Sequence, residues 1–150
     1  MKLILPAFLL TTFFSSQAQI LDPVKWNFSS KKIGDKTFEV QLTATLNTNW
    51  HIYSQTQSSD ASVQPTEVNF SANPLVTLDG KVKELGKMEI VHDRKLGFSV
   101  NQYSGKVVFV QKIKVKSNTK TTVVGTIEYM TCDNSRCLPP KKIPFTITLK

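Results

Sequence analysis

Cys132 and Cys137 are the residues of this 150-residue chain best suited to chemistry. They are its only two cysteines, which excludes both a multi-disulfide framework and a four-cysteine zinc site. Four turn-forming residues, 133–136, separate them. Pro139 and Pro140 follow and restrict the path of the chain, because the proline ring locks φ. The pattern predicts a tight loop that carries two neighbouring sulfur atoms at the edge of the fold.

Two interpretations of this pair remain open from the spacing alone. As a permanent staple, a disulfide closing a loop of about six residues would stabilise the fold by only roughly 2 kcal/mol in the loop-entropy model. As a redox-active pair, the sulfurs would alternate between dithiol and disulfide. The basic residues Arg136, Lys141 and Lys142 favour the thiolate that attacks disulfides, whereas Asp133 opposes it.

Other catalytic chemistry has little support in the sequence. A copper site on a β-sandwich would need a histidine and a methionine after the cysteine, yet His51 and His92 both precede Cys132. The chain has no Gly-x-Ser-x-Gly motif and no histidine pair at the spacing of a zinc-binding helix. We therefore expect no metal and no cofactor beyond the two sulfurs, and we interpret both histidines as structural.

The formal net charge of +8 at pH 7 raises the question of a nucleic-acid partner. The lysines are scattered, and Lys112, Lys114 and Lys116 recur at every second residue, which is typical of the solvent face of a strand. Binding of single-stranded nucleic acid would require basic residues interleaved with exposed aromatic ones. We expect no nucleic-acid partner.

The first residues are typical of an export signal. Lys2 precedes an apolar run over residues 3–14, and small residues follow at 15–18. The run is shorter than the about 20 residues that a membrane-spanning helix needs. We expect residues 1–19 to be a cleaved signal peptide and residues 20–150 to be a single domain, exported to a compartment where disulfides persist.

The elements that must position the cysteines are strands. Apolar and polar residues alternate from Phe38 to Leu46, the pattern of a half-buried strand. Further strands are expected at residues 24–28, 50–53, 67–70, 88–91, 96–100, 107–115, 123–129 and 143–149. The segments 107–115 and 123–129 are predicted to form a hairpin around a turn at 117–120. The prediction is an all-β, immunoglobulin-like β-sandwich of about seven to nine strands.

The residues around the cysteines resemble a known family. Tyr129-Met130-Thr131-Cys132 and Cys137-Leu138-Pro139-Pro140 resemble the active-site loop of the N-terminal periplasmic domain of the disulfide-interchange protein DsbD, which lies on an immunoglobulin-like sandwich. Trp50-His51-Ile52-Tyr53 stands where that family has an aromatic cluster beside its cysteines. Residues 86–94 resemble the family's Gly-Lys-x-Glu-Ile-Tyr-x-Asp-Arg segment. These segments follow the family's order along most of the chain after the signal peptide.

The resemblance implies periplasmic thiol–disulfide exchange, in which the domain takes electrons from a thioredoxin-like partner and passes them to acceptors such as disulfide isomerases. Cys137 would form the transient mixed disulfide and Cys132 would resolve it. The protein would act as a monomer. The residues expected to line the site are Trp50, His51, Tyr53, Leu85, Tyr129, Arg136 and Pro139.

The sequence departs from the family pattern in three places. The loop between the cysteines has four residues, fewer than in the best-known members. Where the family's cap loop carries aromatic residues that shield the cysteines, residues 83–86 offer only Leu85. The chain ends at Lys150, so we expect a stand-alone domain with a separate membrane protein as electron donor.

A different class of function also fits the sequence. The protein would then be a non-catalytic, exported β-sandwich binding module, with Cys132–Cys137 as a permanent structural disulfide. Trp26 and Trp50 would suit carbohydrate binding in such a module. Replacing both cysteines by serine would leave binding intact, whereas it would abolish exchange.

Overall fold

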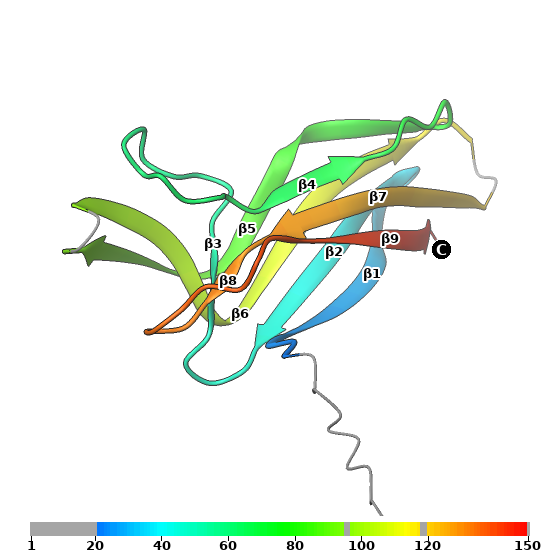
Figure 1. Ribbon diagram of the computed structural model, residues 1–150. Coiled ribbons are helices and arrows are strands. Elements are labelled where there is room, and N and C mark those ends of the chain that lie inside the picture. The colour runs from blue at the N-terminus through cyan, green and yellow to red at the C-terminus, as the bar shows by residue number, and fades with distance from the viewer. Residues whose placement is uncertain (1–20, 95–96, 118–119, 150) are drawn as a thin grey trace, which may run out of the picture.

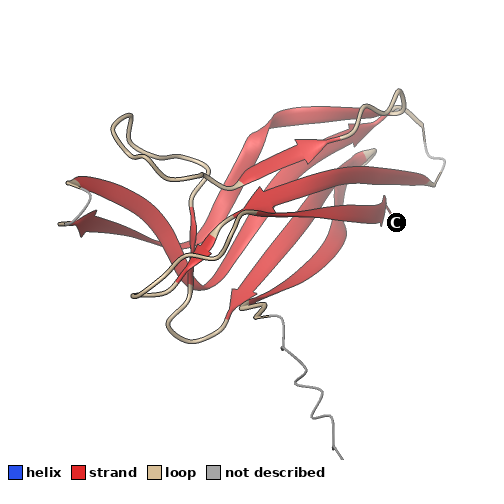
Figure 2. Ribbon diagram, in the orientation of Figure 1, coloured by secondary structure: helices blue, strands red, loops and turns tan. Residues whose placement is uncertain are grey.

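The computed structural model describes residues 21–94, 97–117 and 120–149. In these ranges the chain forms nine β-strands and no helix, and the strands make two sheets that face each other across an apolar core (Figures 1 and 2). The all-β, immunoglobulin-like sandwich expected from the sequence is confirmed. The predicted signal peptide, residues 1–19, lies outside the described residues. No described part of the chain forms a helix that is long and apolar enough to cross a membrane.

Both sheets are antiparallel. The strands of the larger sheet are β1 (Val24–Gly34), β2 (Thr37–Leu46), β3 (His51–Tyr53), β5 (Val76–Asp93), β6 (Phe98–Val115) and β8 (Thr131–Cys132). Their order is β1-β2-β6-β3-β8, and β5 also pairs with β6. The smaller sheet contains β4 (Glu67–Phe70), β7 (Thr121–Tyr129) and β9 (Lys141–Leu149), in the order β4-β7-β9. The long strand β6 is therefore the centre of the larger sheet.

The core forms because alternate residues of each strand point inward. In β2 the buried residues are Phe38, Val40, Leu42, Ala44 and Leu46. The facing sheet contributes Val123, Ile127, Tyr129, Phe145, Ile147 and Leu149. Gly125 interrupts this series because a Cβ atom at its position would overlap the carbonyl oxygen of Asn69 and the ring of Phe145.

Strand β6 joins residues 98–100 of the predicted segment 96–100 to the predicted segment 107–115, and Leu96 lies outside the described residues. Ser104, Gly105 and Lys106 between them are exposed, so the apolar alternation is broken there although the strand continues. Its ladder passes from β2, where Lys106 pairs with Thr45, to β3, where Ser104 pairs with His51. The strand character of residues 76–87, which belong to β5, was not predicted at all.

The predicted hairpin of 107–115 with 123–129 is wrong. The first segment belongs to β6 in the larger sheet, and the second is β7 in the smaller one. The inward side chains of a strand are buried by the facing sheet whichever strand is its hydrogen-bonded neighbour, so the alternation of burial does not distinguish the two arrangements. The observed hairpin of β6 is with β5, and its far end extends beyond the rest of the sandwich (Figure 1).

Candidate functional site

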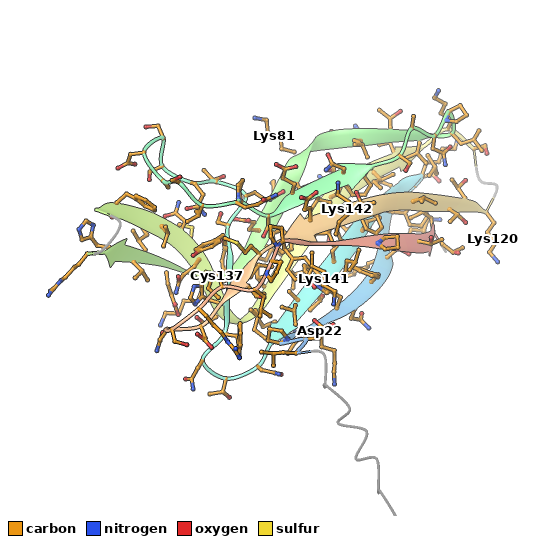
Figure 3. All side chains as sticks on the ribbon, in the orientation of Figure 1. Asp22, Lys81, Lys120, Cys137, Lys141 and Lys142 are labelled. Carbon is orange, nitrogen blue, oxygen red and sulfur yellow. A yellow bond between two sulfur atoms is a disulfide. The ribbon has the colours of Figure 1, made fainter. Side chains whose placement is uncertain are left out.

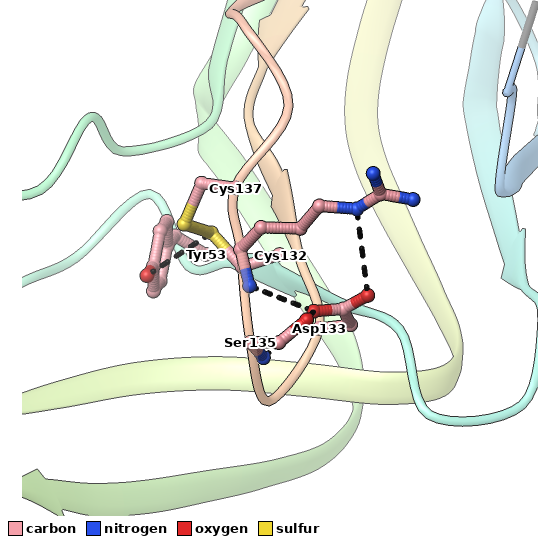
Figure 4. Close-up of a disulfide and its surroundings, with 6 residues drawn as sticks. Tyr53, Cys132, Asp133, Ser135 and Cys137 are labelled. Carbon is pink, nitrogen blue, oxygen red and sulfur yellow. Dashed lines mark hydrogen bonds and ion pairs between the residues drawn. A yellow bond between two sulfur atoms is a disulfide. The ribbon is translucent and has the colours of Figure 1, made fainter.

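Cys132 and Cys137 face each other across a tight hairpin and are joined by a disulfide (Figure 4). The N–H of Asp133 donates to the carbonyl of Arg136 at 2.9 Å, and a second backbone hydrogen bond of 2.8 Å lies on the other side of the pair. The cysteines thus occupy a non-hydrogen-bonded pair, where opposite residues come closest in an antiparallel ladder, and their Cα atoms are 4.0 Å apart. The backbone itself holds the two cysteines together.

The turn between the cysteines is organised by Asp133. Its Oδ1 accepts hydrogen bonds from the N–H and the hydroxyl of Ser135 and from the N–H of Arg136, each 2.8 Å long. These bonds, the backbone bond from Ser135 first, lower the pKa of the Asp133 carboxyl. The Nε of Arg136 lies 3.9 Å from Asp133 Oδ2, so this carboxylate partly offsets the positive charge beside the cysteines.

Lys141 and Lys142, which the sequence analysis counted as basic neighbours of the cysteines, form ion pairs of their own. Lys141 Nζ lies 2.6 Å from Asp22 Oδ2, and Lys142 Nζ lies 2.7 Å from a carboxylate oxygen of Glu128. Figure 3 labels Cys137, Lys141, Lys142 and Asp22. Because each lysine faces an acidic partner, neither supplies an uncompensated charge to the thiolate.

The two sulfurs differ in their access to solvent. Cys132 is only 2% exposed and belongs to a small apolar cluster with Tyr53, Phe98 and Val100. The Tyr53 hydroxyl lies 3.4 Å from Cys132 Sγ, within hydrogen-bonding reach (Figure 4). Cys137, in contrast, is an exposed residue. An approaching thiolate can therefore reach Cys137 far more readily than Cys132.

A surface hollow of about 460 Å³ lies in front of the disulfide. The lining residues are His51, Tyr53, Val91, Val100, Gln102 and the loop residues 132–137. The sequence analysis missed Val91, Val100 and Gln102. They reach the site because the outer half of the β5–β6 hairpin passes beside β3, with Val91 opposite Val100. Residues 86–94, which include Val91, were noted for their resemblance to the family and for a predicted strand at 88–91, but not as site residues.

His51 lies at the centre of this arrangement. It pairs with Ser104 of β6 on one side and with Cys132 on the other, and its ring stands edge-on to Tyr53 at a centroid distance of 5.7 Å. Burial lowers the pKa of His51, and the negative charges of Glu89 and Asp133 offset this only in part. The imidazole is therefore neutral at pH 7.

Three other predicted site residues lie away from the hollow. Trp50 packs against the main core at the start of β3. Tyr129 is buried, with its ring centroid 5.2 Å from that of Trp26. Tyr129 and Pro139 line a separate hollow of about 200 Å³. None of the three lines the hollow in front of the disulfide.

Leu85 also lies away from the hollow. It is 57% exposed and sits opposite Val108 in the β5–β6 ladder, because the segment expected to be a cap loop is part of a strand. The adjacent Glu84 fastens this strand: its carboxylate accepts hydrogen bonds from the Ser54 hydroxyl at 2.6 Å and the Tyr103 hydroxyl at 3.0 Å. The same carboxylate raises the pKa of Tyr103, which burial has already raised, to about 12.

The described residues do not contain a cluster of three or more histidine, cysteine, aspartate or glutamate side chains that could hold a metal ion. The site contains the Cys132–Cys137 disulfide. The fold and the site together define a β-sandwich domain that carries a solvent-accessible disulfide on a surface hairpin.

The chain belongs to the family described as "Thiol:disulfide interchange protein DsbD, N-terminal", whose model matches residues 17–148. The resemblance expected from the sequence is thus confirmed. No curated protein matches the chain.

Solved structures support the same fold. The N-terminal periplasmic domain of ScsB from Proteus mirabilis has a TM-score of 0.58 at 16% identity, and the match covers 89% of this chain and 49% of that one. This chain therefore spans about half of that ScsB chain. The reduced N-terminal domain of DsbD from Neisseria meningitidis has a TM-score of 0.55 at 14% identity, over 89% and 94% of the two chains. A complex of the DsbD and PilB N-terminal domains from the same organism gives 0.53 at 11% identity, over 85% and 87%.

Proposed function

We propose that this protein performs thiol–disulfide exchange in the periplasm, passing electrons through Cys132 and Cys137 to or from thioredoxin-like or disulfide isomerase proteins. The observation that carries the proposal is the asymmetry of the disulfide, in which Cys137 is exposed and Cys132 is buried against Tyr53. Family membership supports it independently.

The asymmetry supports different roles for the two sulfurs. A partner thiolate attacks Cys137 Sγ, the S–S bond breaks, and its electron pair goes to Cys132 Sγ. The second thiolate of the partner then attacks the partner sulfur in the mixed disulfide and releases Cys137. The partner leaves oxidised, and the domain keeps two electrons and takes up two protons. In the opposite direction, Cys137 attacks a partner disulfide and Cys132 resolves the intermediate.

The residues around the pair assist this step. The Tyr53 hydroxyl, 3.4 Å from Cys132 Sγ, is placed to donate a hydrogen bond as negative charge develops on the leaving sulfur. Asp133 keeps the turn in shape through its three hydrogen bonds, so the cysteines stay opposite each other when the bond is broken. His51, Arg136 and the loop form the surface that a partner contacts.

The location and partners are part of the proposal. Residues 1–19 act as an export signal, and the mature domain works as a monomer. The ScsB domain that resembles it is periplasmic by its description, and a DsbD N-terminal domain is known in complex with a PilB domain. The proposed electron donor is a membrane protein.

Single-cysteine variants test the roles of the sulfurs. A purified thioredoxin-like domain that keeps only its attacking cysteine is mixed with Cys132→Ser or Cys137→Ser protein that has been activated by an aromatic disulfide. The Cys132→Ser protein is expected to form a covalent complex on a non-reducing gel. The Cys137→Ser protein is expected to form little, because its remaining sulfur is buried. Equal complex formation by the two variants would contradict the assignment.

The reduction potential separates exchange from the alternative, a permanent staple in a binding module. The protein is equilibrated with a thiol redox buffer and its free cysteines are counted by alkylation. A potential above about −300 mV is expected, as for labile disulfides, whereas a value well below it would establish a structural bond. The alternative is also weakened by Trp26, whose ring packs 6.0 Å from Phe109 and 5.2 Å from Tyr129 instead of standing free for carbohydrate.

A further inference from the structure

We infer that the Cys132–Cys137 disulfide also reacts directly with low-molecular-weight thiols of about tripeptide size, which enter the hollow in front of Cys137. The inference rests on the proposed function, since the same two sulfurs exchange, and it adds a second class of substrate. The hollow measures about 460 Å³, within the range of small-molecule sites, about 300–1,000 Å³.

The walls of the hollow suit a small polar thiol. Val91, which is 40% exposed, and Val100 offer apolar surface. Gln102 lines the hollow with an amide whose Nε2 donates to Glu89 at 3.4 Å, and His51 contributes a neutral imidazole. The Arg136 side chain is 63% exposed at the rim; its Nε lies 3.9 Å from Asp133, which also lines the hollow, and the exposed part of its guanidinium can pair with a carboxylate of the incoming molecule. A peptide thiol that carries carboxylates and amides fits this set of groups.

Residues 83–86 of β5 and the loop after β3 are each held by their own hydrogen bonds and do not line the hollow. The part of β5 expected to act as a cap is held by Glu84, which binds the Ser54 hydroxyl and also accepts a 2.7 Å hydrogen bond from the N–H of Gln55. In the loop after β3, the Gln57 amide mimics a strand residue: it donates to the Asn101 carbonyl at 2.7 Å and accepts from the Asn101 N–H at 3.0 Å. The lining of the hollow includes no residue of 83–86 and none of the loop that follows Tyr53.

The reaction balances without any further reactant. A small thiolate attacks Cys137 Sγ, the S–S bond breaks, and the electron pair passes to Cys132 Sγ. A second small thiolate attacks the small-molecule sulfur of the mixed disulfide, so that a small-molecule disulfide leaves and Cys137 is released. Two small thiols are oxidised, the protein disulfide is reduced by two electrons, and the two protons pass to the cysteines.

Filling the hollow tests the inference. Oxidised mature protein is mixed with reduced glutathione, and both the adduct on Cys137 and the free thiols are followed by mass spectrometry and alkylation. Val91→Trp places a large ring over the hollow and is expected to slow the reaction by at least about tenfold. Ile90→Trp is the matched control: Ile90 is the neighbouring residue, is 70% exposed and does not line the hollow, so its rate is expected to stay at the wild-type value.

The Arg136→Ala variant provides a second, milder test. It is expected to slow reduction by glutathione, which carries carboxylates, and to leave reduction by cysteamine, which carries none, unchanged. An oxidised peptide of residues 129–140 has the same sulfurs without the hollow. Glutathione is expected to reduce the folded protein at least as fast as this peptide.

The outcomes separate the inference from the proposed function. If the folded protein reacts with glutathione more than about tenfold more slowly than the peptide, or if Val91→Trp and Ile90→Trp behave alike, the inference is overturned. If a reduced thioredoxin-like domain still reduces the protein in that case, the proposed function stands. If neither glutathione nor the thioredoxin-like domain reduces it, both fail.

Discussion

Reduction of the disulfide is expected to destabilise the folded protein by about 2 kcal/mol. The bond closes a short loop, because Cys132 and Cys137 are five positions apart. In the folded protein the backbone hydrogen bonds of the hairpin and the Asp133 carboxylate hold the two cysteines together whether or not the bond exists. The disulfide therefore lowers the conformational entropy of the unfolded chain only, which makes unfolding less favourable. In the loop-entropy model, a loop of this size stabilises the fold by about 2 kcal/mol.

The same thermodynamic cycle predicts a reduction potential. If folding favours the oxidised form by about 2 kcal/mol, the potential of the folded pair lies about 40 mV below that of an unstructured peptide of residues 129–140, since about 30 mV corresponds to 1.4 kcal/mol. Urea unfolding of the oxidised and reduced protein gives the stability difference, and equilibration of protein and peptide with one glutathione buffer gives the potentials. A reduced protein as stable as the oxidised one would refute the reasoning, because the hairpin would then relax when the bond opens.

Two further predictions concern stability. Burial lowers the pKa of His51, so the unfolded chain binds a proton at this residue more readily than the folded protein does. The contribution of neutral His51 to the free energy of unfolding is therefore expected to be fully present above pH 6.5, the ordinary pKa, and to be lost as the pH falls below it. The urea midpoint of His51→Gln should fall less between about pH 7 and pH 5 than that of the wild type, and an identical fall would exclude His51 as the source. Gly125→Ala should cost about 1–3 kcal/mol or more in urea unfolding, since its Cβ would overlap Asn69 and Phe145. Gly34→Ala, whose Cβ would meet only Thr37 at 3.6 Å, should be nearly neutral, and equal effects of the two substitutions would contradict this account.

Sequence patterns predicted individual strands better than their partners. The nine-residue alternation from Phe38 to Leu46 is clear because one face of β2 is buried along its whole length. The alternation in β6 is equally real but is interrupted at Gly105, where the strand exchanges β2 for β3 as its neighbour. Which strands pair depends on contacts between residues far apart in the chain. The alternation of buried and exposed residues along one strand does not identify its neighbours.

Contacts between residues distant in the sequence also limited the prediction of the site. The chemistry of Cys132 and Cys137 was evident from residue type and spacing, and their resemblance to a family located them at an active-site loop. The aromatic residue against the buried sulfur, Tyr53, was also anticipated from that resemblance. Val91 and Val100 were not, because they join the site through the register of a hairpin whose far end the sequence showed only as two short strands.

The sequence by itself determined the class of fold, the pair of reactive sulfurs and the family, because each depends on residue type and short-range order. Only the tertiary structure decided which sulfur is accessible. Cys132 and Cys137 are neighbours in one hairpin, yet β8 carries Cys132 into the apolar cluster around Tyr53, whereas Cys137 lies on the outer side of the turn. Burial is a property of the whole packed molecule, and this difference in burial is the observation on which the proposed separate roles of the two cysteines rest.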